Sequence, residues 1–141
     1  MTDRIKGNCL CGGVRFETEF KGAAEYGACH CSMCQHWNGG PGLAGEFVNT
    51  GFDSDETLRW FRSSDWAERG FCFTCGSNLF YRLVGMPQLL MIQVGCLDLP
   101  DGVTLAEHIF IDEKPDHYDF AGSAPRLTGA EFLARLQDTS E

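Results

Sequence analysis

Seven of the eight cysteines lie in three short clusters, and these constrain the chain more than any other sequence feature. The clusters are Cys9-Leu10-Cys11, Cys29-His30-Cys31-Ser32-Met33-Cys34 and Cys72-Phe73-Thr74-Cys75. Pairs of the form C-x-C and C-x-x-C are typical of tetrahedral metal sites, in which short cysteine turns converge on one ion. The two outer clusters together supply four ligands, whereas the central cluster supplies three.

The outer clusters predict a structural zinc site. Its expected ligands are Cys9, Cys11, Cys72 and Cys75. On an extended segment the two sulfurs of C-x-C lie on the same side, where a disulfide between them would be strained. Zinc holds each sulfur at ~2.3 Å and so accommodates a wider pair, with iron as the main competing metal. A glycine follows each outer pair (Gly12 and Gly76), and glycine permits the positive φ that a zinc knuckle requires.

The central cluster predicts a second zinc ion, bound by Cys29, Cys31 and Cys34. Three protein ligands are usual for a catalytic zinc and four for a structural one, so these cysteines are also the candidate catalytic residues. An external thiol such as glutathione would be deprotonated at such a site. Its thiolate would then attack the carbonyl carbon of a small aldehyde and form a hemithioacetal.

Other residues compete for the fourth position at the central zinc. Cys96 would complete a second set of four cysteines, although a lone cysteine on an expected strand is most often a small buried hydrophobic residue. His30 lies between two ligands and should point away from the metal if the segment is extended. His36 reaches the metal only if its loop folds back.

Alternating apolar and polar residues predict a mainly β, antiparallel sheet protein forming a single domain over residues 1–141. The clearest alternation runs from Val14 to Phe20. The expected strands are residues 14–20, 26–29, 43–48, 58–62, 79–84, 88–97 and 108–112, and residues 67–72 lead into the third cysteine cluster. The segment Gln35 to Gly42 contains three glycines and a proline and predicts a mobile loop. This loop is either a segment that could cover a substrate or an ordinary connector.

One short helix is expected at the C-terminus. Thr128 is its N-cap, and Glu131 completes a capping box three residues later. The apolar stripe of this helix is expected to contain Phe132, Leu133 and Leu136.

The charge balance of 11 basic and 20 acidic residues gives a net charge of −9, which makes nucleic acid or an anionic membrane an unexpected partner. The N-terminal stretch MTDRIKGNCLCGG lacks the apolar region of a signal peptide. The longest apolar stretch, Leu89 to Leu99, is too short and too interrupted to span a membrane. A cytoplasmic protein is therefore expected. In that compartment cysteine clusters are metal sites more readily than a disulfide framework, with thiol redox sensing a weaker alternative.

Five motifs, in this order, resemble the glutathione-dependent formaldehyde-activating family, to which centromere protein V is also similar. They are G-x-C-x-C-G at 7–12, C-H-C-S-x-C at 29–34, F-C-x-x-C-G at 71–76, G-x-L-D at 95–98 and H-I-F at 108–110. The resemblance implies a β-tent fold, with a structural zinc at the outer cysteines and a catalytic zinc at the central ones. It also implies a carbon–sulfur lyase reaction that interconverts S-(hydroxymethyl)glutathione with glutathione and formaldehyde.

A second class of function is a non-catalytic zinc-binding module that engages a protein through its sheet, because a fold does not fix a function. Two closed Cys₄ sites, one including Cys96, would characterise this module. The enzyme instead needs positive groups for anionic glutathione. The candidates for that role are Arg59, Arg62, Arg69 and Arg82.

Overall fold

The computed structural model describes residues 4–139, and the contacts within the chain divide it into two compact units. The first unit contains the chain up to Ala24 together with Ala44–Val103, and the second contains Glu25–Leu43 and the chain from Thr104 onward. The single domain over residues 1–141 stays a prediction. Residues 1–3, which begin the stretch read for a signal peptide, lie outside the described residues.

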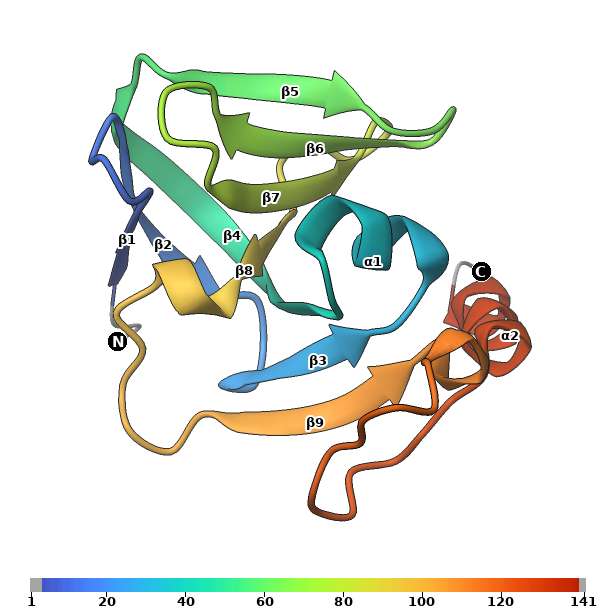
Figure 1. Cartoon of the computed structure of the whole chain (residues 1–141). Helices are drawn as coiled ribbons and strands as arrows, with labels where there is room; N and C mark the ends of the chain where they lie inside the picture. The colour runs from blue at the N-terminus through green and yellow to red at the C-terminus, as the bar shows by residue number, and fades with distance from the viewer. Residues whose placement is uncertain (1–3, 140–141) are drawn as a thin grey trace. The chain divides into compact units, whose positions relative to one another are not determined.

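The first unit is built on a sheet whose strands follow the order β1-β2-β4-β8-β7-β6-β5 (Figure 1). The strands are β1 (Ile5–Asn8), β2 (Val14–Phe20), β4 (Gly42–Asp55), β5 (Leu58–Arg62), β6 (Ala67–Cys72), β7 (Asn78–Leu83) and β8 (Leu90–Gln93). Each neighbouring pair in this order is antiparallel. The prediction of a mainly antiparallel β protein is confirmed.

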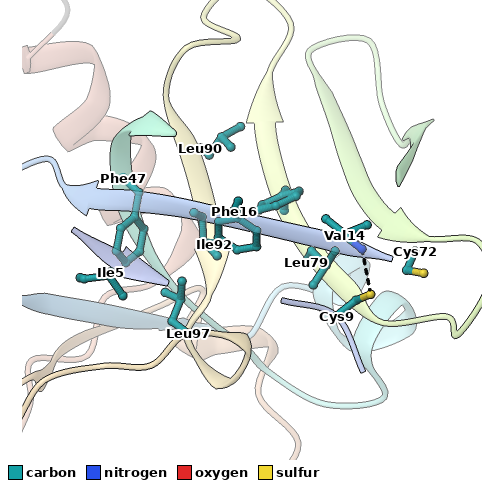
Figure 2. Packing of buried hydrophobic residues seen from close by; sticks show 11 residues of the cluster. Ile5, Cys9, Val14, Phe16, Phe47, Cys72, Leu79, Leu90, Ile92 and Leu97 are labelled. Atoms are coloured by element: carbon teal, nitrogen blue, oxygen red, sulfur yellow. Dashed lines mark hydrogen bonds between the residues drawn. The ribbon is translucent and has the colours of Figure 1, made fainter. Parts of the chain in front are cut away.

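Strand β2 shows why the sheet forms where alternation is strong. Its residues Val14, Phe16 and Thr18 are buried, and the residues between them face outward or are half-buried. The ring of Phe16 packs edge-on against Phe80, with ring centroids 5.0 Å apart. Figure 2 shows Phe16 among the other buried side chains of this core, which includes the candidate ligands Cys9 and Cys72 at one end. Two of the four outer cysteines, Cys9 and Cys72, are therefore anchored in the hydrophobic core of the first unit, whereas Cys11 is exposed.

The second unit contains two parallel strands, β3 (Glu25–Cys29) and β9 (Thr104–Ile109), which lie side by side in Figure 1. The short helix α1 (Ser32–Asn38) follows β3. A 3₁₀ turn, η2 (Ile111–Glu113), follows β9, and the C-terminal helix is α2 (Gly129–Thr139). None of the helices in residues 4–139 is long and apolar enough to cross a membrane.

The predicted capping box at the start of α2 is confirmed. The Glu131 N–H donates to the Thr128 hydroxyl at 3.1 Å, and the Thr128 N–H donates to the Glu131 carboxylate at 2.8 Å. Within the expected apolar stripe, Phe132 packs against Phe110 with ring centroids 5.9 Å apart. Leu133 and Leu136, however, are about half exposed.

The prediction of a mobile loop at 35–42 is wrong over its first half. Residues 35–38 belong to α1, which ends at Gly39 with a left-handed φ of 73°. The Gly39 N–H closes the helix by donating to the Gln35 carbonyl at 2.8 Å. The glycines expected to loosen the segment instead stop a short helix, because glycine adopts this C-terminal cap without strain.

Three expected strands differ from the observed strands by more than one residue at an end. The strand at 88–97 is shorter, because β8 ends at Gln93 and a 3₁₀ turn, η1 (Val94–Cys96), follows. The strand at 108–112 lies earlier as β9, because Phe110 adopts a left-handed φ of 55° that ends extended backbone. The strand at 43–48 extends through Asp55 as β4, since β2 pairs along it.

Candidate metal centres

The outer cysteines come together within the first unit. Their four sulfurs, from Cys9, Cys11, Cys72 and Cys75, all lie within 4.8 Å of one another. The Cys9–Cys11 and Cys11–Cys72 sulfur separations are both 3.7 Å. Tetrahedral zinc with Zn–S bonds of ~2.3 Å places sulfurs about 3.8 Å apart, so the spacing fits a zinc ion.

Two similar backbone turns present these sulfurs. In one, the Gly12 N–H donates to the Cys9 carbonyl at 3.2 Å; in the other, the Gly76 N–H donates to the Cys72 carbonyl at 2.8 Å. Both glycines have left-handed φ values, 82° and 80°, as the sequence predicts. The Cys75 N–H points back to the Cys72 sulfur at 3.4 Å. Such N–H···S contacts stabilise sulfur that carries negative charge, which suits metal-bound thiolates.

Two hydroxyl side chains near the outer sulfurs were not expected from the sequence. The Ser77 hydroxyl lies 3.2 Å from the Cys75 sulfur, and its hydrogen bond lowers the pKa of the Cys75 thiol to about 5. The Cys72 thiol is 3.2 Å from the Thr57 hydroxyl. Ser77 directly follows the glycine of its knuckle, a usable sequence signal, whereas Thr57 reaches the site only through the pairing of β5 with β6.

The central cysteines come together within the second unit. Cys29 is the last residue of β3, Cys31 is the N-cap of α1, and Cys34 lies in the first turn of that helix. Their sulfurs lie within 4.8 Å of one another, and the Cys34 N–H donates to the Cys31 sulfur at 3.3 Å. Hydrogen bonds with the Cys31 and Cys34 sulfurs, together with burial, raise the pKa of the Cys29 thiol far above its usual range. Three adjacent thiolates therefore need a cation to be ionised together, and soft sulfur donors suit zinc.

Glu113, the last residue of η2, holds the segment that carries the central cysteines. It lies about eighty residues later in the sequence. The Ser32 N–H, at the first position of α1, donates to the Glu113 carboxylate at 2.8 Å. The Gln35 side-chain amide donates to the His30 carbonyl at 2.7 Å and to the Glu113 carbonyl at 2.8 Å. These contacts fix the backbone on both sides of Cys31. No sequence pattern pointed to Glu113, and Gln35 was expected only as part of a loop that could cover a substrate.

His30 points to a second buried histidine. Its Nε2 lies 2.9 Å from Nδ1 of His108, and both side chains are almost fully buried, with Phe120 packed edge-on against the pair. Burial, followed by the charge of His108, lowers the pKa of His30 to about 4. Among the described residues no group bonds to His30 Nδ1. A buried N–H without an acceptor is costly, so the His30 proton belongs on Nε2, where it bonds to His108.

Residues 4–139 contain two metal-ligand groups, the outer four and the central three cysteines. His30 and His36, the histidines considered as a fourth ligand, are in neither group. Cys96 belongs to the first unit, where its thiol donates to the Gln93 carbonyl at 3.0 Å and packs against the hydrophobic core. Burial raises the pKa of Cys96 to about 12. Cys96 is likewise in neither of the two metal-ligand groups within residues 4–139.

A cleft of about 330 Å³ lies in the second unit along one face of α1. Its lining residues are Ser32, Gln35, His36, Gly39, Gly40, Pro115, His117 and Tyr118. Those from α1 follow the spacing of three and four residues that defines one helix face, and Cys34 faces another direction. Residues 35–42, expected to form a mobile loop that could cover a substrate, instead supply most of α1 and part of one wall of this cleft.

The four arginines considered for glutathione all lie on β5, β6 and β7 of the first unit. Arg82 makes a 2.8 Å ion pair with Glu68 and stacks over Trp60. Arg69 is buried, and its side chain contacts the Ser63 hydroxyl and the Tyr81 ring. These contacts give both residues a role in holding the sheet.

The fold and the two cysteine groups define a mainly antiparallel β protein with two centres suited to metal ions. A family model described as "glutathione-dependent formaldehyde-activating enzyme" matches residues 4–113, and the chain belongs to this family. An uncharacterized lyase of Schizosaccharomyces pombe is 28% identical over 132 residues, which cover 93% of this chain and 96% of the yeast protein. A crystal structure of a Rhodobacter sphaeroides protein has a similar fold, with a TM-score of 0.59 and 22% identity, covering 86% of this chain and 98% of the other.

Proposed function

We propose that this protein is a zinc-dependent carbon–sulfur lyase-type enzyme of the S-(hydroxymethyl)glutathione synthase kind. Its substrate is an adduct of glutathione, or a similar small thiol, with formaldehyde or another small aldehyde. The observation that carries the proposal is the convergence of three sulfurs, from Cys29, Cys31 and Cys34, at a centre separate from the four-sulfur one. Family membership and the lyase name of the yeast relative support it.

The two centres have different roles in this proposal, and each chain binds two zinc ions. The outer cysteines hold a structural ion that stabilises the first unit. Zinc at the central cysteines would keep a thiol substrate in its thiolate form. Glu113 and Gln35 keep the three central sulfurs in position through the backbone of the ligand segment.

The reaction forms or breaks one carbon–sulfur bond. In the synthetic direction the thiol sulfur bonds to the carbonyl carbon of formaldehyde, and the carbonyl oxygen takes up the proton that the thiol lost. In the lyase direction the hydroxyl loses that proton, the carbon–sulfur bond breaks, and formaldehyde leaves. No electrons are gained or lost overall, so no redox partner is required. The acidic chain favours small-molecule substrates over nucleic acid or membranes, and a cytoplasmic location would supply reduced thiols.

Exchange spectroscopy tests the proposal directly. NMR measures the exchange between formaldehyde and its glutathione adduct with and without the zinc-loaded protein. We expect the protein to accelerate exchange, the Cys31→Ser variant to lose most of the acceleration, and the Cys96→Ser variant to keep it. An exchange rate unchanged by the wild-type protein at full zinc occupancy would refute the lyase activity.

A further inference from the structure

We infer that the outer edge of β5 is the surface through which two copies of this chain pair, strand to strand and antiparallel, about a two-fold axis at Trp60. β5 is the last strand in the sheet order of the first unit and lies at its end in Figure 1. Within residues 4–139, β6 is the strand that pairs with it, on one side. The backbone N–H and C=O groups on the open side of such a strand can bond to another strand. The inference does not depend on the proposed function.

Chain segments cover the corresponding edges elsewhere in the molecule. At the far end of the same sheet order, the Asp98 N–H donates to the Lys6 carbonyl of β1 at 2.8 Å. In the second unit, the Leu127 N–H donates to the His108 carbonyl of β9 at 2.9 Å. Among the described residues, β5 is not covered in this way, because no isolated bridge or strand pairs with its outer side.

The side chains of β5 leave this edge open to a second strand. Edge strands are usually protected by proline, lysine, an inward-pointing charge or a bulge. β5 has the sequence Leu-Arg-Trp-Phe-Arg and pairs with β6 without a register shift. Phe61 is 53% exposed. The Arg62 guanidinium donates to the carbonyls of Ser64 and Asp65, both at 2.8 Å, and is therefore held at the hairpin turn.

The sequence of β5 is complementary to itself in one antiparallel register. With Trp60 opposite its counterpart in the second copy, Arg59 faces Phe61 of that copy, and the two-fold axis repeats the contact. An axis at Arg59 would place this arginine opposite itself, and like charges directly opposite are destabilising. An axis at Phe61 would place Arg59 opposite Ser63, beyond the end of β5. The Trp60-centred register therefore pairs the whole strand without opposing two charges.

The Arg59 side chain suits an aromatic neighbour from a second copy. Its guanidinium lies over the Phe73 ring of its own chain, 4.2 Å from the ring centroid. A guanidinium is planar and weakly hydrated, so its other face can stack on the Phe61 ring of the second copy. The net charge of −9 opposes association of two chains, but β5 itself contains no acidic residue. Association should therefore strengthen when salt screens the long-range repulsion.

Sedimentation velocity of the zinc-loaded full chain, over a concentration series, tests this contact. We expect a weak dimer, because pairing of two short strands buries little surface. Phe61→Lys places an ammonium group opposite Arg59 at both symmetric contacts and should weaken association about tenfold or more. Phe61→Glu should keep the dimer, because its carboxylate then faces Arg59. The double variant Arg59→Glu, Phe61→Lys, in which the charges are exchanged, should recover it.

Met86→Lys is the matched control, because Met86 is an exposed apolar residue in the turn after β7, away from β5. It should associate like the wild type. Hydrogen exchange supplies a second measurement: amides of β5 should exchange more slowly as the protein concentration rises. Circular dichroism and native mass spectrometry check the folded state and zinc content of each variant.

Three results would overturn the inference. The first is a wild-type protein that stays monomeric throughout the concentration series. The second is a dimer that Phe61→Lys leaves intact, because the contact then lies on another surface. The third is equal weakening by Phe61→Lys and Phe61→Glu, because Arg59 then does not face residue 61 of the second copy.

Discussion

The carboxylate of Glu113 accepts a hydrogen bond at 2.8 Å from the backbone N–H of Ser32, a residue 81 positions earlier in the chain. Ser32 is the first residue of α1 and follows the ligand Cys31. The N–H groups of a first helical turn lack partners within the helix, so a carboxylate there stabilises the helix start. Glu113 therefore holds the backbone of the segment that carries the three central cysteines.

We predict that Glu113→Ala weakens zinc binding at the central centre about fivefold, because losing such a cap costs ~1 kcal/mol. Competition with a chromophoric chelator measures the affinity. Glu113→Gln, which keeps an acceptor oxygen, should recover most of it. Asp112→Ala is the matched control, since the neighbouring Asp112 accepts instead from the Gly129 N–H of α2 at 2.8 Å. Equal zinc affinity in Glu113→Ala and Asp112→Ala would contradict the assigned role.

Loss of one outer ligand should destabilise the first unit. We expect Cys75→Ser to release the outer zinc and to lower the unfolding free energy by several kcal/mol, because structural zinc binding contributes directly to folding. Native mass spectrometry reports the zinc count, and thermal unfolding reports the stability. Wild-type protein stripped with a chelator should behave similarly and recover when zinc is restored.

The matched cysteine control is Cys96→Ser, which should retain two zinc ions because Cys96 bonds to the Gln93 carbonyl within the first unit. A variant with one zinc ion fewer would show that Cys96 is a ligand. That result would favour the non-catalytic module with two closed sites over the enzyme.

The buried histidine pair should make stability fall in mild acid. Burial lowers the pKa of both His30, to about 4, and His108. In the unfolded chain the imidazoles titrate near ~6.5, so below that pH the unfolded state binds more protons than the folded state. The unfolding free energy should therefore decrease as pH falls from about 6.5 toward the lowered folded pKa values.

Denaturant unfolding of the zinc-loaded protein at about pH 7.5 and about pH 6 measures this dependence. His108→Asn removes one buried imidazole while keeping an acceptor for His30, and it should reduce the loss of stability between the two pH values. His117→Ala removes an exposed imidazole and should leave the loss unchanged. Because thiolate protonation affects both variants, an equal pH dependence in the two would refute the role of the buried pair.

Local patterns identified several elements correctly. Strands β2 and β5 have the predicted bounds, Val14–Phe20 and Leu58–Arg62. The capping box of α2 also forms as expected. In each case the determining interactions lie within a few residues. Helix α1 was missed because seven residues rich in polar and aromatic groups have little helical stability alone, and its start depends on Glu113.

The spacing of the cysteines was enough to group their sulfurs. Cys9, Cys11, Cys72 and Cys75 were grouped correctly from spacing, and so were the three central cysteines, because C-x-C and C-x-x-C turns place ligands by local backbone geometry. The tertiary structure decided what surrounds them: the Glu113 contact with Ser32, the pairing of His30 with His108, and the cleft along α1. These contacts join segments about eighty residues apart. They depend on the parallel register of β3 with β9, which no short stretch of the sequence encodes.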